Sequence, residues 1–377
     1  MTPKLTDIIA RETHGTSYKT LKYSLDDSES RDDSEPSKVW ERSAESSPHP
    51  KYIDLQPLAK VLARSGTQRL TYFLDGSRRI FNVDEIAYSL SGGRRALYPV
   101  MAGQIITGCC KRIDRRLVPE KYQHEIVIAL PDTADFDNNA RRGFWQALSQ
   151  KLSAGLKTYG LSITEVIHYK TGQDSHTPYH DRAAAAIQAC MLKREQELTE
   201  SLARKKLLDS TNYLIKDGSL EYRKKSGVPI QNYRWVIGLS KTFNPSACAG
   251  TTGKADPGYI ADLPVGHRTQ AACYSHTMTG DTKFAVWYIR LHERARTSSA
   301  FSGVVKAEKM LVTASESDSG QMDSAEIDTL SAYILNERNP VCYGRDSRWA
   351  NHIYPVFLTE SYLKSKYLST ESFLHLF

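Results

Sequence analysis

Leu70-Thr71-Tyr72-Phe73-Leu74-Asp75-Gly76-Ser77 is the stretch of this sequence that decides the fold, and Tyr213-Leu214-Ile215-Lys216-Asp217-Gly218-Ser219 repeats its pattern later in the chain. Both are apolar, β-prone runs that lead into an Asp-Gly-Ser triplet. A strand that ends in Asp delivers a carboxylate to the rim of a sheet, and the glycine lets backbone or ligand approach closely. One such triplet would be ordinary turn chemistry. Two of them predict that Asp75 and Asp217 together hold a divalent metal over a phosphodiester.

The bulk composition is that of a globular protein. The chain has 377 residues, of which 40% are hydrophobic and 25% are charged, enough for one large domain or two ordinary ones. No apolar run is long enough to span a bilayer and the first residues lack a signal-peptide core, so we expect a cytoplasmic protein that does not enter a membrane. The six cysteines include no Cys-x-x-Cys pair, which favours free thiols over a structural zinc site.

Charge is distributed unevenly along the chain. The formal net charge is +7 at pH 7, although residues 26–35 are mostly acidic, so the remainder is more basic than the total indicates. Basic clusters flank both triplets, among them Arg78-Arg79 and Arg223-Lys224-Lys225. This arrangement favours an anionic substrate.

The periodicity of apolar residues predicts a mixed α/β architecture. Residues 1–50 form an N-terminal region with an acidic, Ser-rich flexible segment, and an ordered domain follows from residue 51. We expect helices over 53–62, 141–157, 181–208 and 324–337 and from 356 onward, strands over 70–74, 78–83, 97–108, 122–130, 211–216, 233–239, 283–292 and 302–312, and a large loop over 244–281. The order is not regular βαβ winding, so the strands belong to one mixed sheet flanked by helices.

A third acidic residue is expected on the helix over 181–208. Glu195 lies four residues after Met191 and three before Leu198, so it shares the buried apolar stripe. Glu197 and Glu200 fall off this stripe. A carboxylate on a buried face is costly unless it is paired or metal-bound. Glu195 therefore either binds metal with the two aspartates or pairs with Arg194 or a nearby lysine.

Two aspartates at strand ends and a glutamate on a helix are typical of two-metal phosphoryl chemistry. Carboxylate and water ligands suit Mn²⁺ or Mg²⁺ rather than zinc. We therefore predict Asp75, Glu195 and Asp217 as both the metal ligands and the catalytic carboxylates.

Several short motifs, in this order, resemble the NurA family of nucleases. They are Phe73-Leu74-Asp75-Gly76-Ser77, the helix that carries Glu195, Leu214-Ile215-Lys216-Asp217-Gly218-Ser219-Leu220, Val236-Ile237-Gly238-Leu239-Ser240-Lys241 and Tyr354-Pro355-Val356-Phe357-Leu358. The resemblance implies an RNase H-like sheet with family insertions and makes residues 51–377 one NurA-like nuclease domain.

The resemblance also implies a function. It implies a manganese-preferring DNA nuclease with 5′-3′ exonuclease and single-strand endonuclease activity. It implies a homodimer that works with a HerA-type hexameric ATPase in DNA end processing or anti-phage defence.

Further site residues follow from the same motifs. Lys241 ends its strand near the expected site, where it either contacts a phosphate or is an exposed strand-end lysine. The family often has a histidine eight residues after the tyrosine of the Tyr-Pro pair, where this chain has Tyr362, while His352 lies upstream. Either this branch uses another group there or the site is altered. The residues expected to contact DNA are Arg78, Arg79, Arg223, Lys224 and Tyr362.

Two other interpretations stay open. The chain is a degenerate NurA-like subunit that docks the ATPase and guides DNA without cleaving it, or it is another RNase H-like enzyme such as a resolvase or a PIWI-type nuclease.

Overall fold

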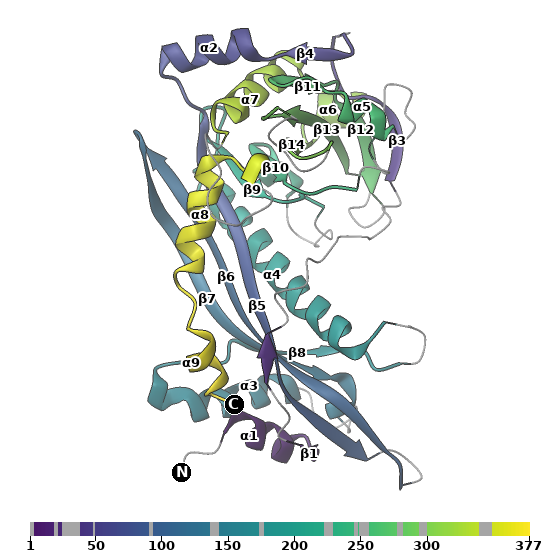
Figure 1. Ribbon diagram of the computed structural model, residues 1–377, viewed down its shortest axis with the longest axis vertical. Helices are drawn as coiled ribbons and strands as arrows, with labels where there is room; N and C mark the ends of the chain where they lie inside the picture. Colours follow the sequence, from purple (N-terminus) through teal and green to yellow (C-terminus); the bar gives the residue numbers. More distant parts are fainter. Residues whose placement is uncertain are drawn as a thin grey trace.

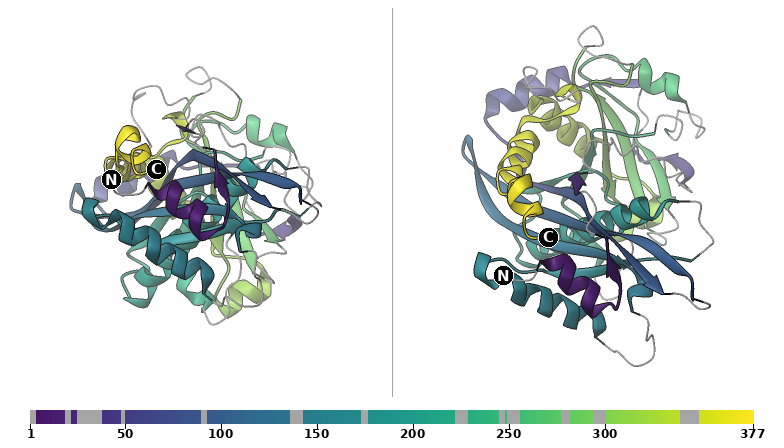
Figure 2. Two further views of the ribbon diagram at one scale, coloured as in Figure 1. Left: turned by 90° about the horizontal axis from the view of Figure 1, so that it is seen from below. Right: turned by 60° about the horizontal axis from the view of Figure 1, so that its bottom comes forward.

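A long mixed β-sheet runs through the molecule, with helices on both of its faces (Figures 1 and 2). The structure is a computed structural model that describes residues 4–18, 22–24, 38–47, 50–89, 93–135, 143–172, 177–221, 229–244, 248, 256–276, 282–293, 300–338 and 349–377. The helices are α1 (Leu5–Glu12), α2 (Gln56–Ser65), α3 (Phe144–Leu156), α4 (Tyr179–Arg204), α5 (Pro257–Ala261), α6 (Ala314–Ser319), α7 (Ser324–Asn336), α8 (Tyr354–Lys364) and α9 (Thr370–Leu374). Within these ranges, no helix is both long and apolar enough to cross a membrane.

The sheet contains three long antiparallel strands, β5, β6 and β7, with shorter strands on either side of them. The strands are β1 (Thr16–Ser17), β2 (Tyr23–Ser24), β3 (Lys38–Ser43), β4 (Tyr52–Asp54), β5 (Leu70–Ser89), β6 (Arg95–Ile113), β7 (Arg116–Pro131), β8 (Glu165–Tyr169), β9 (Tyr213–Asp217), β10 (Val236–Ser240), β11 (His267–Thr269), β12 (Ala272–His276), β13 (Lys283–Arg290) and β14 (Val304–Met310).

The centre of this sheet has an RNase H-like strand order. β5, β6 and β7 pair antiparallel in succession, and β9 pairs parallel with β5 on its other side. β10 continues parallel to β9, which gives the order β7-β6-β5-β9-β10. β8 extends one end, and β14, β13, β12 and β3 extend the other. The predicted fold class, an RNase H-like mixed sheet flanked by helices with insertions, is confirmed.

The first Asp-Gly-Ser triplet does not end a strand. The sequence predicts a turn at residues 75–77, but β5 is continuous there, and Asp75 and Gly76 pair with Gly108 and Thr107 of β6. Because β6 forms hydrogen bonds with the backbone groups of the triplet, residues 75–77 stay extended. These bonds override the local preference of Asp-Gly for a turn. The prediction of a strand end is wrong for Asp75.

The second triplet behaves as predicted. Asp217 is the last residue of β9, and Gly218 follows with a φ of 87°, a conformation that glycine adopts without strain.

The predicted loop over 244–281 is also wrong in part, because α5, β11 and β12 lie within it. β12 pairs with both β13 and β3, so partners distant in the sequence stabilise a segment whose own pattern is weak. The segment after β14 contains α6, which begins with a capping box between Thr313 and Glu316. Tyr233 belongs to a 3₁₀ turn rather than to β10.

Helices α4 and α8 cover opposite faces of the long strands (Figure 1). A Cβ added to Gly103 of β6 would lie 2.8 Å from Ile187 of α4, whereas one added to Gly108 would lie 2.5 Å from Leu363 of α8. Positions 103 and 108 point to opposite faces because side chains alternate along a strand. The sheet therefore separates the α4 side from the α8 side.

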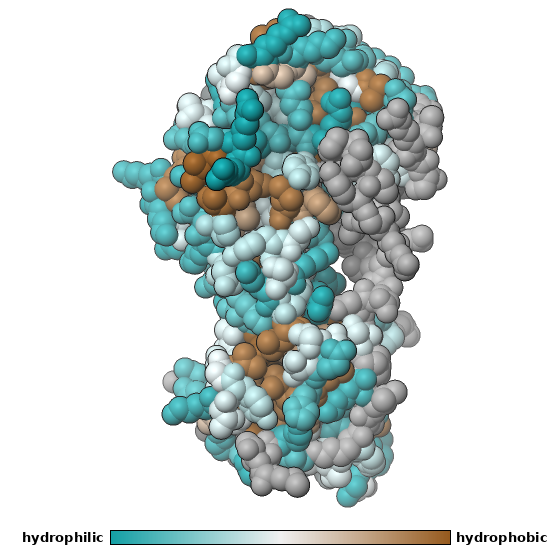
Figure 3. All heavy atoms as spheres, turned by 60° about the vertical axis from the view of Figure 1, so that its left-hand side comes forward, coloured by the Kyte–Doolittle hydropathy of each residue, from teal (hydrophilic) through white to brown (hydrophobic). Residues whose placement is uncertain are grey.

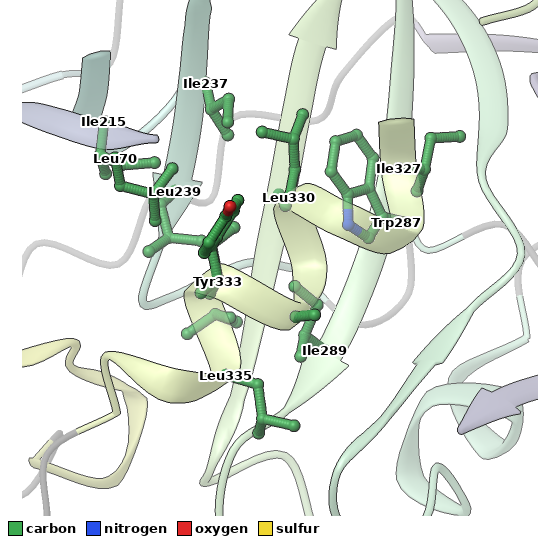
Figure 4. Close-up of a cluster of buried hydrophobic side chains, with 14 of the residues drawn as sticks. Leu70, Ile215, Ile237, Leu239, Trp287, Ile289, Ile327, Leu330, Tyr333 and Leu335 are labelled. Atoms are coloured by element: carbon green, nitrogen blue, oxygen red, sulfur yellow. The ribbon is translucent and has the colours of Figure 1, made fainter. Parts of the chain in front are cut away.

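The core on the α8 side is built around α7, as Figure 4 shows. Ile327, Leu330 and Tyr333 of α7 pack against β9, β10 and β13, where Trp287 is fully buried. The indole Nε1 of Trp287 donates to Ser331 Oγ at 2.8 Å, so its polar atom is satisfied. This core supports the strands whose ends carry the site.

Parts of residues 1–50 are built into the fold. β3 pairs with β12, and the backbone N–H of Leu5 donates to the carbonyl of Leu376 at 3.3 Å. The acidic stretch 26–35 lies outside the described residues. The domain boundary at residue 50 stays a prediction.

Candidate metal centre

Asp75 and Asp217 lie on neighbouring strands and face the same side of the sheet. β5 and β9 pair in parallel with Leu74 opposite Lys216, so Asp75 and Asp217 follow at the next position of each strand. Leu74 packs with side chains of α4, and alternation directs the two aspartates to the α8 side. The structure brings together the two aspartates that the sequence predicts.

Glu360 of α8 completes the group. One carboxylate oxygen from each of Asp75, Asp217 and Glu360 lies within 4.8 Å of the others. Helix α8 begins at the Tyr354-Pro355 pair, where proline is well tolerated, and then lies along β5 and β6. Glu360 takes the third position, which the sequence analysis assigned to Glu195.

The signal that identifies Glu360 is present in the sequence. Glu360 lies four residues after Val356 and three before Leu363, both of which are buried. Glu195 has the same spacing on the longer helix, so helical periodicity indicates a buried position for both glutamates.

The ammonium of Lys241 lies between two of the three acids. Its Nζ is 2.7 Å from Asp217 Oδ2 and 3.2 Å from Glu360 Oε2. Lys241 directly follows β10, in which Leu239 pairs with Asp217, so the strand register places the lysine beside the group. Lys241 therefore lies beside the acids, and its side chain is 11% exposed, so it is not the exposed strand-end lysine of the alternative interpretation.

Burial and charge set the protonation of these groups. Burial, followed by repulsion from Asp217, raises the pKa of Asp75 well above its usual range. Burial opposes the charge on Glu360, but attraction by Lys241 and Lys364 outweighs it and lowers the pKa of Glu360 to about 2. Burial likewise opposes the charge on Lys241, yet its acidic neighbours raise its pKa. The site thus concentrates three acidic side chains whose charge Lys241 and Lys364 only partly balance.

Glu195 is buried as predicted, but it lies on the α4 side of the sheet. Its Oε2 pairs with Lys216 Nζ at 2.9 Å, and a Cβ added to Gly76 would lie 2.3 Å from its Oε1. Lys216 and Gly76 alternate with Asp217 and Asp75, so the sheet separates Glu195 from the two aspartates. Of the alternatives set by the sequence, the structure shows the ion pair with a nearby lysine.

The other two glutamates of α4 have partners of their own. Glu197 is half-buried and pairs with Arg194 at 3.1 Å. Glu200 is buried, contrary to expectation, and accepts a hydrogen bond from the hydroxyl of Tyr233 at 3.0 Å. Neither approaches the three-acid group within the described residues.

A buried glutamate of β14 holds the turn after Asp217. Glu308 accepts hydrogen bonds from the Ser219 hydroxyl at 2.7 Å and from the backbone N–H of Leu220. Lys306 Nζ lies 2.9 Å from its other carboxylate oxygen. These bonds fix the chain directly beyond Asp217, so Glu308 is a positioning residue that sequence reasoning missed. No local pattern distinguishes it from other strand glutamates.

His352 and Tyr362 occupy different places around α8. His352 is buried, and its Nε2 lies 3.9 Å from Glu360 Oε2. Tyr362 instead packs edge-on against Tyr122 of β7, with ring centroids 5.8 Å apart. The imidazole beside the site therefore comes from upstream of the Tyr-Pro pair.

The residues expected to contact DNA are scattered. Arg78 and Arg79 are half-buried in the middle of β5 and point to opposite faces. Arg79 lies over the ring of Tyr367, 4.5 Å from its centroid. Arg223 and Lys224 lie outside the described residues.

The three acids fit a hard divalent cation. They offer carboxylate oxygens from three separate elements at a spacing that one ion can bridge. Burial, followed by repulsion from Asp217, raises the pKa of Asp75, and a bound cation would offset both effects by stabilising the ionised carboxylate. Asp75, Asp217 and Glu360 on an RNase H-like sheet thus form a candidate site for Mg²⁺ or Mn²⁺.

Comparison with known proteins gives a similarity among solved structures. No family model and no curated protein matches this chain. Among solved structures it is similar to the NurA nuclease from Sulfolobus solfataricus, with a TM-score of 0.41 and 9% sequence identity over 82% of this chain and 88% of that chain.

Proposed function

We propose that this chain is a metal-dependent DNA nuclease of the NurA type, which hydrolyses phosphodiester bonds. The observation that carries the proposal is the meeting of Asp75, Asp217 and Glu360 with oxygens within 4.8 Å of one another. A divalent ion bound there supplies charge stabilisation to the phosphate and lowers the pKa of a water molecule.

The carboxylates, Lys241 and Glu308 have distinct roles in this proposed nuclease. The three carboxylates orient the ion, and the sheet and α8 keep them in place because each comes from a separate packed element. Lys241 holds a positive charge beside Asp217 and contacts a non-bridging oxygen of the phosphate. Glu308 keeps the turn after Asp217 from moving.

The finer features follow from the motif resemblance. We propose a preference for Mn²⁺ over Mg²⁺, 5′-3′ exonuclease and single-strand endonuclease activity, and a cytoplasmic role in DNA end processing or anti-phage defence. We also propose a homodimer that works with a HerA-type hexameric ATPase. Hydrophobic residues gather in two groups on the face in Figure 3, in the upper and lower halves of the molecule, and this face is the first to test for subunit contacts.

One observation favours the non-cleaving alternative. Lys241 already pairs with two of the three carboxylates, as it would in a subunit that only guides DNA and docks an ATPase. The two functions differ in whether a divalent ion displaces this lysine.

The test is cleavage of end-labelled DNA by the purified chain. Single-stranded DNA, duplex DNA, RNA and an RNA–DNA hybrid are incubated with MnCl₂, with MgCl₂ or with EDTA, in the presence and absence of a HerA-type ATPase. We expect DNA cleavage with Mn²⁺ and none with EDTA. Preference for RNA or hybrid would instead favour another RNase H-like enzyme.

Variants of the acids connect activity to the site. Asp75→Asn, Asp217→Asn and Glu360→Gln should abolish cleavage, whereas Glu371→Gln, which alters an exposed acid on α9, should not. If the wild-type chain fails to cleave under every condition, the non-cleaving function is correct. Full activity of Glu360→Gln would exclude the three-acid site.

A further inference from the structure

The strand register places an exposed tyrosine in the same row as the candidate metal centre. Asp75 of β5 is opposite Gly108 of β6, and Gly108 is opposite Tyr122 of β7. Opposite residues share a face, so Tyr122 projects to the α8 side, as Asp75 does. Two strand spacings separate their backbones, about 10 Å.

Helix α8 crosses this row, and different side chains of the helix contact Asp75, Gly108 and Tyr122 or lie beside them. Glu360 lies with the aspartates, Leu363 lies over Gly108, and Tyr362 packs against Tyr122 with an interplanar angle of 87°. Gly108 lets the helix approach, because a Cβ there would lie 2.5 Å from Leu363 Cδ2. The aromatic pair and the acids are therefore held at one separation by the same helix.

The aromatic pair is partly exposed to solvent, and a lysine ammonium lies near both rings. The residue Tyr122 is 45% exposed. Lys366 Nζ lies 4.6 Å from the ring centroid of Tyr362 and 5.8 Å from that of Tyr122. A single exposed tyrosine is ordinary, but two rings with an ammonium offer both a stacking surface and a phosphate contact.

We propose that Tyr122, Tyr362 and Lys366 form a stacking site for a base of single-stranded DNA. The proposal rests on the nuclease function proposed above and specifies the substrate of the same site. A stacked strand advances ~3.4 Å per nucleotide, so the stacked base lies about three nucleotides from the phosphate at the carboxylates. A base inside a duplex has both faces covered by its stacked neighbours, so the site favours single strands.

The experiment measures binding without cleavage. Fluorescence anisotropy follows a labelled oligodeoxythymidine, an abasic oligomer of the same length and a blunt duplex, all in EDTA. Tyr122→Leu removes the ring and Tyr122→Phe keeps it, and Tyr159→Leu is the matched control, because Tyr159 is 51% exposed and belongs to the 3₁₀ turn Lys157–Tyr159 after α3.

We expect Tyr122→Leu to weaken oligodeoxythymidine binding by about 5- to 150-fold, the range for loss of one stacked base. Tyr122→Phe and Tyr159→Leu should bind as the wild type does. The wild type should prefer the oligodeoxythymidine to the abasic oligomer, and Tyr122→Leu should lose that preference. Unchanged binding by Tyr122→Leu, or equal wild-type affinity for both oligomers, would overturn the proposal.

A second variant covers the case in which Tyr122→Leu does not fold, as judged by its thermal unfolding curve. Lys366→Gln should weaken binding and reduce the slope of log Kd against log salt by about 1, because it removes one phosphate contact. An unchanged slope would overturn the role of Lys366. Base-dependent binding by a chain that never cleaves would refute the nuclease alone, and cleavage with no effect of the Tyr122 variants would refute the stacking site alone.

Discussion

Lys241 and Asp217 form an ion pair, with Nζ 2.7 Å from Oδ2, at the centre of the three-acid group. Glu360 shares the same ammonium at 3.2 Å. Lys241 therefore balances part of the negative charge of Asp217 and Glu360, and a divalent ion must compete with it for these carboxylates.

Replacing Lys241 should change how strongly metal stabilises the fold. Lys241→Gln removes the ammonium beside Asp217 and leaves Glu360 with Lys364 as its lysine partner, so we expect the free energy of unfolding in EDTA to fall by about 3–5 kcal/mol. Mn²⁺ should then raise the unfolding temperature more in Lys241→Gln than in the wild type. Scanning fluorimetry with and without MnCl₂ measures both effects, and exposed Lys157→Gln is the control. An equal shift with Mn²⁺ in variant and wild type would show that Lys241 does not compete with metal.

Glu195 should matter for folding and not for metal binding. Glu195→Gln removes the carboxylate that balances the charge of buried Lys216, which costs about 3–5 kcal/mol. The double variant Glu195→Gln/Lys216→Met removes both charges and should recover most of this loss. The shift in unfolding temperature on adding Mn²⁺ should persist in both variants. Loss of that shift in the folded double variant would restore Glu195 as a metal ligand.

Gly76 is expected to tolerate no side chain. In Gly76→Ala the new Cβ would lie 2.3 Å from Glu195 Oε1 and push that carboxylate away from Lys216. We expect a loss of about 1–3 kcal/mol, measured by urea denaturation. Gly172→Ala is the matched control, since nothing lies within 4 Å of an added Cβ there. Equal denaturation midpoints for the two variants would contradict the close approach of Glu195.

The buried Glu308 predicts a pH dependence of stability. Burial opposes its ionisation, but attraction by Lys306 and the hydrogen bonds from Ser219 and Leu220 outweigh it and lower the pKa of Glu308. The unfolded value is about 4.3, so the stabilisation is complete above that pH and is lost as pH falls through the lower folded value. Glu308→Gln should therefore cost about 3–5 kcal/mol near pH 7 and less in acid. Urea titrations of wild type and variant across this range measure it, and a pH-independent difference would contradict the charged pair.

The sequence alone predicted that Asp75 and Asp217 lie close together. Both follow apolar β-prone runs, and parallel pairing of β5 with β9 brings equivalent positions together. The predicted turn at Asp75 failed because local Asp-Gly preference is weak compared with a complete partner strand, and that partner is distant in the sequence.

Helical periodicity indicates which face of a helix is buried but not which glutamate lies beside the aspartates. The spacing of Glu195 correctly predicted that it is buried against the sheet. It cannot tell which face of the sheet the helix covers, since both faces present apolar side chains. The same spacing holds for Glu360, whose helix covers the face toward which Asp75 points. The topology, not the pattern, decided between the two glutamates.

The length of β5 sets a fixed distance within the molecule. Asp75 is near its start, and the strand continues to Ser89, about 46 Å further on at ~3.3 Å per residue. Pairing with β6 along this span prevents it from stretching, and removal of a single residue would turn every later side chain to the other face. Any molecule bound near Ser89 is therefore held at a constant distance from the acids. Shortening this distance without turning the later side chains to the other face requires deleting residues in pairs from both β5 and β6.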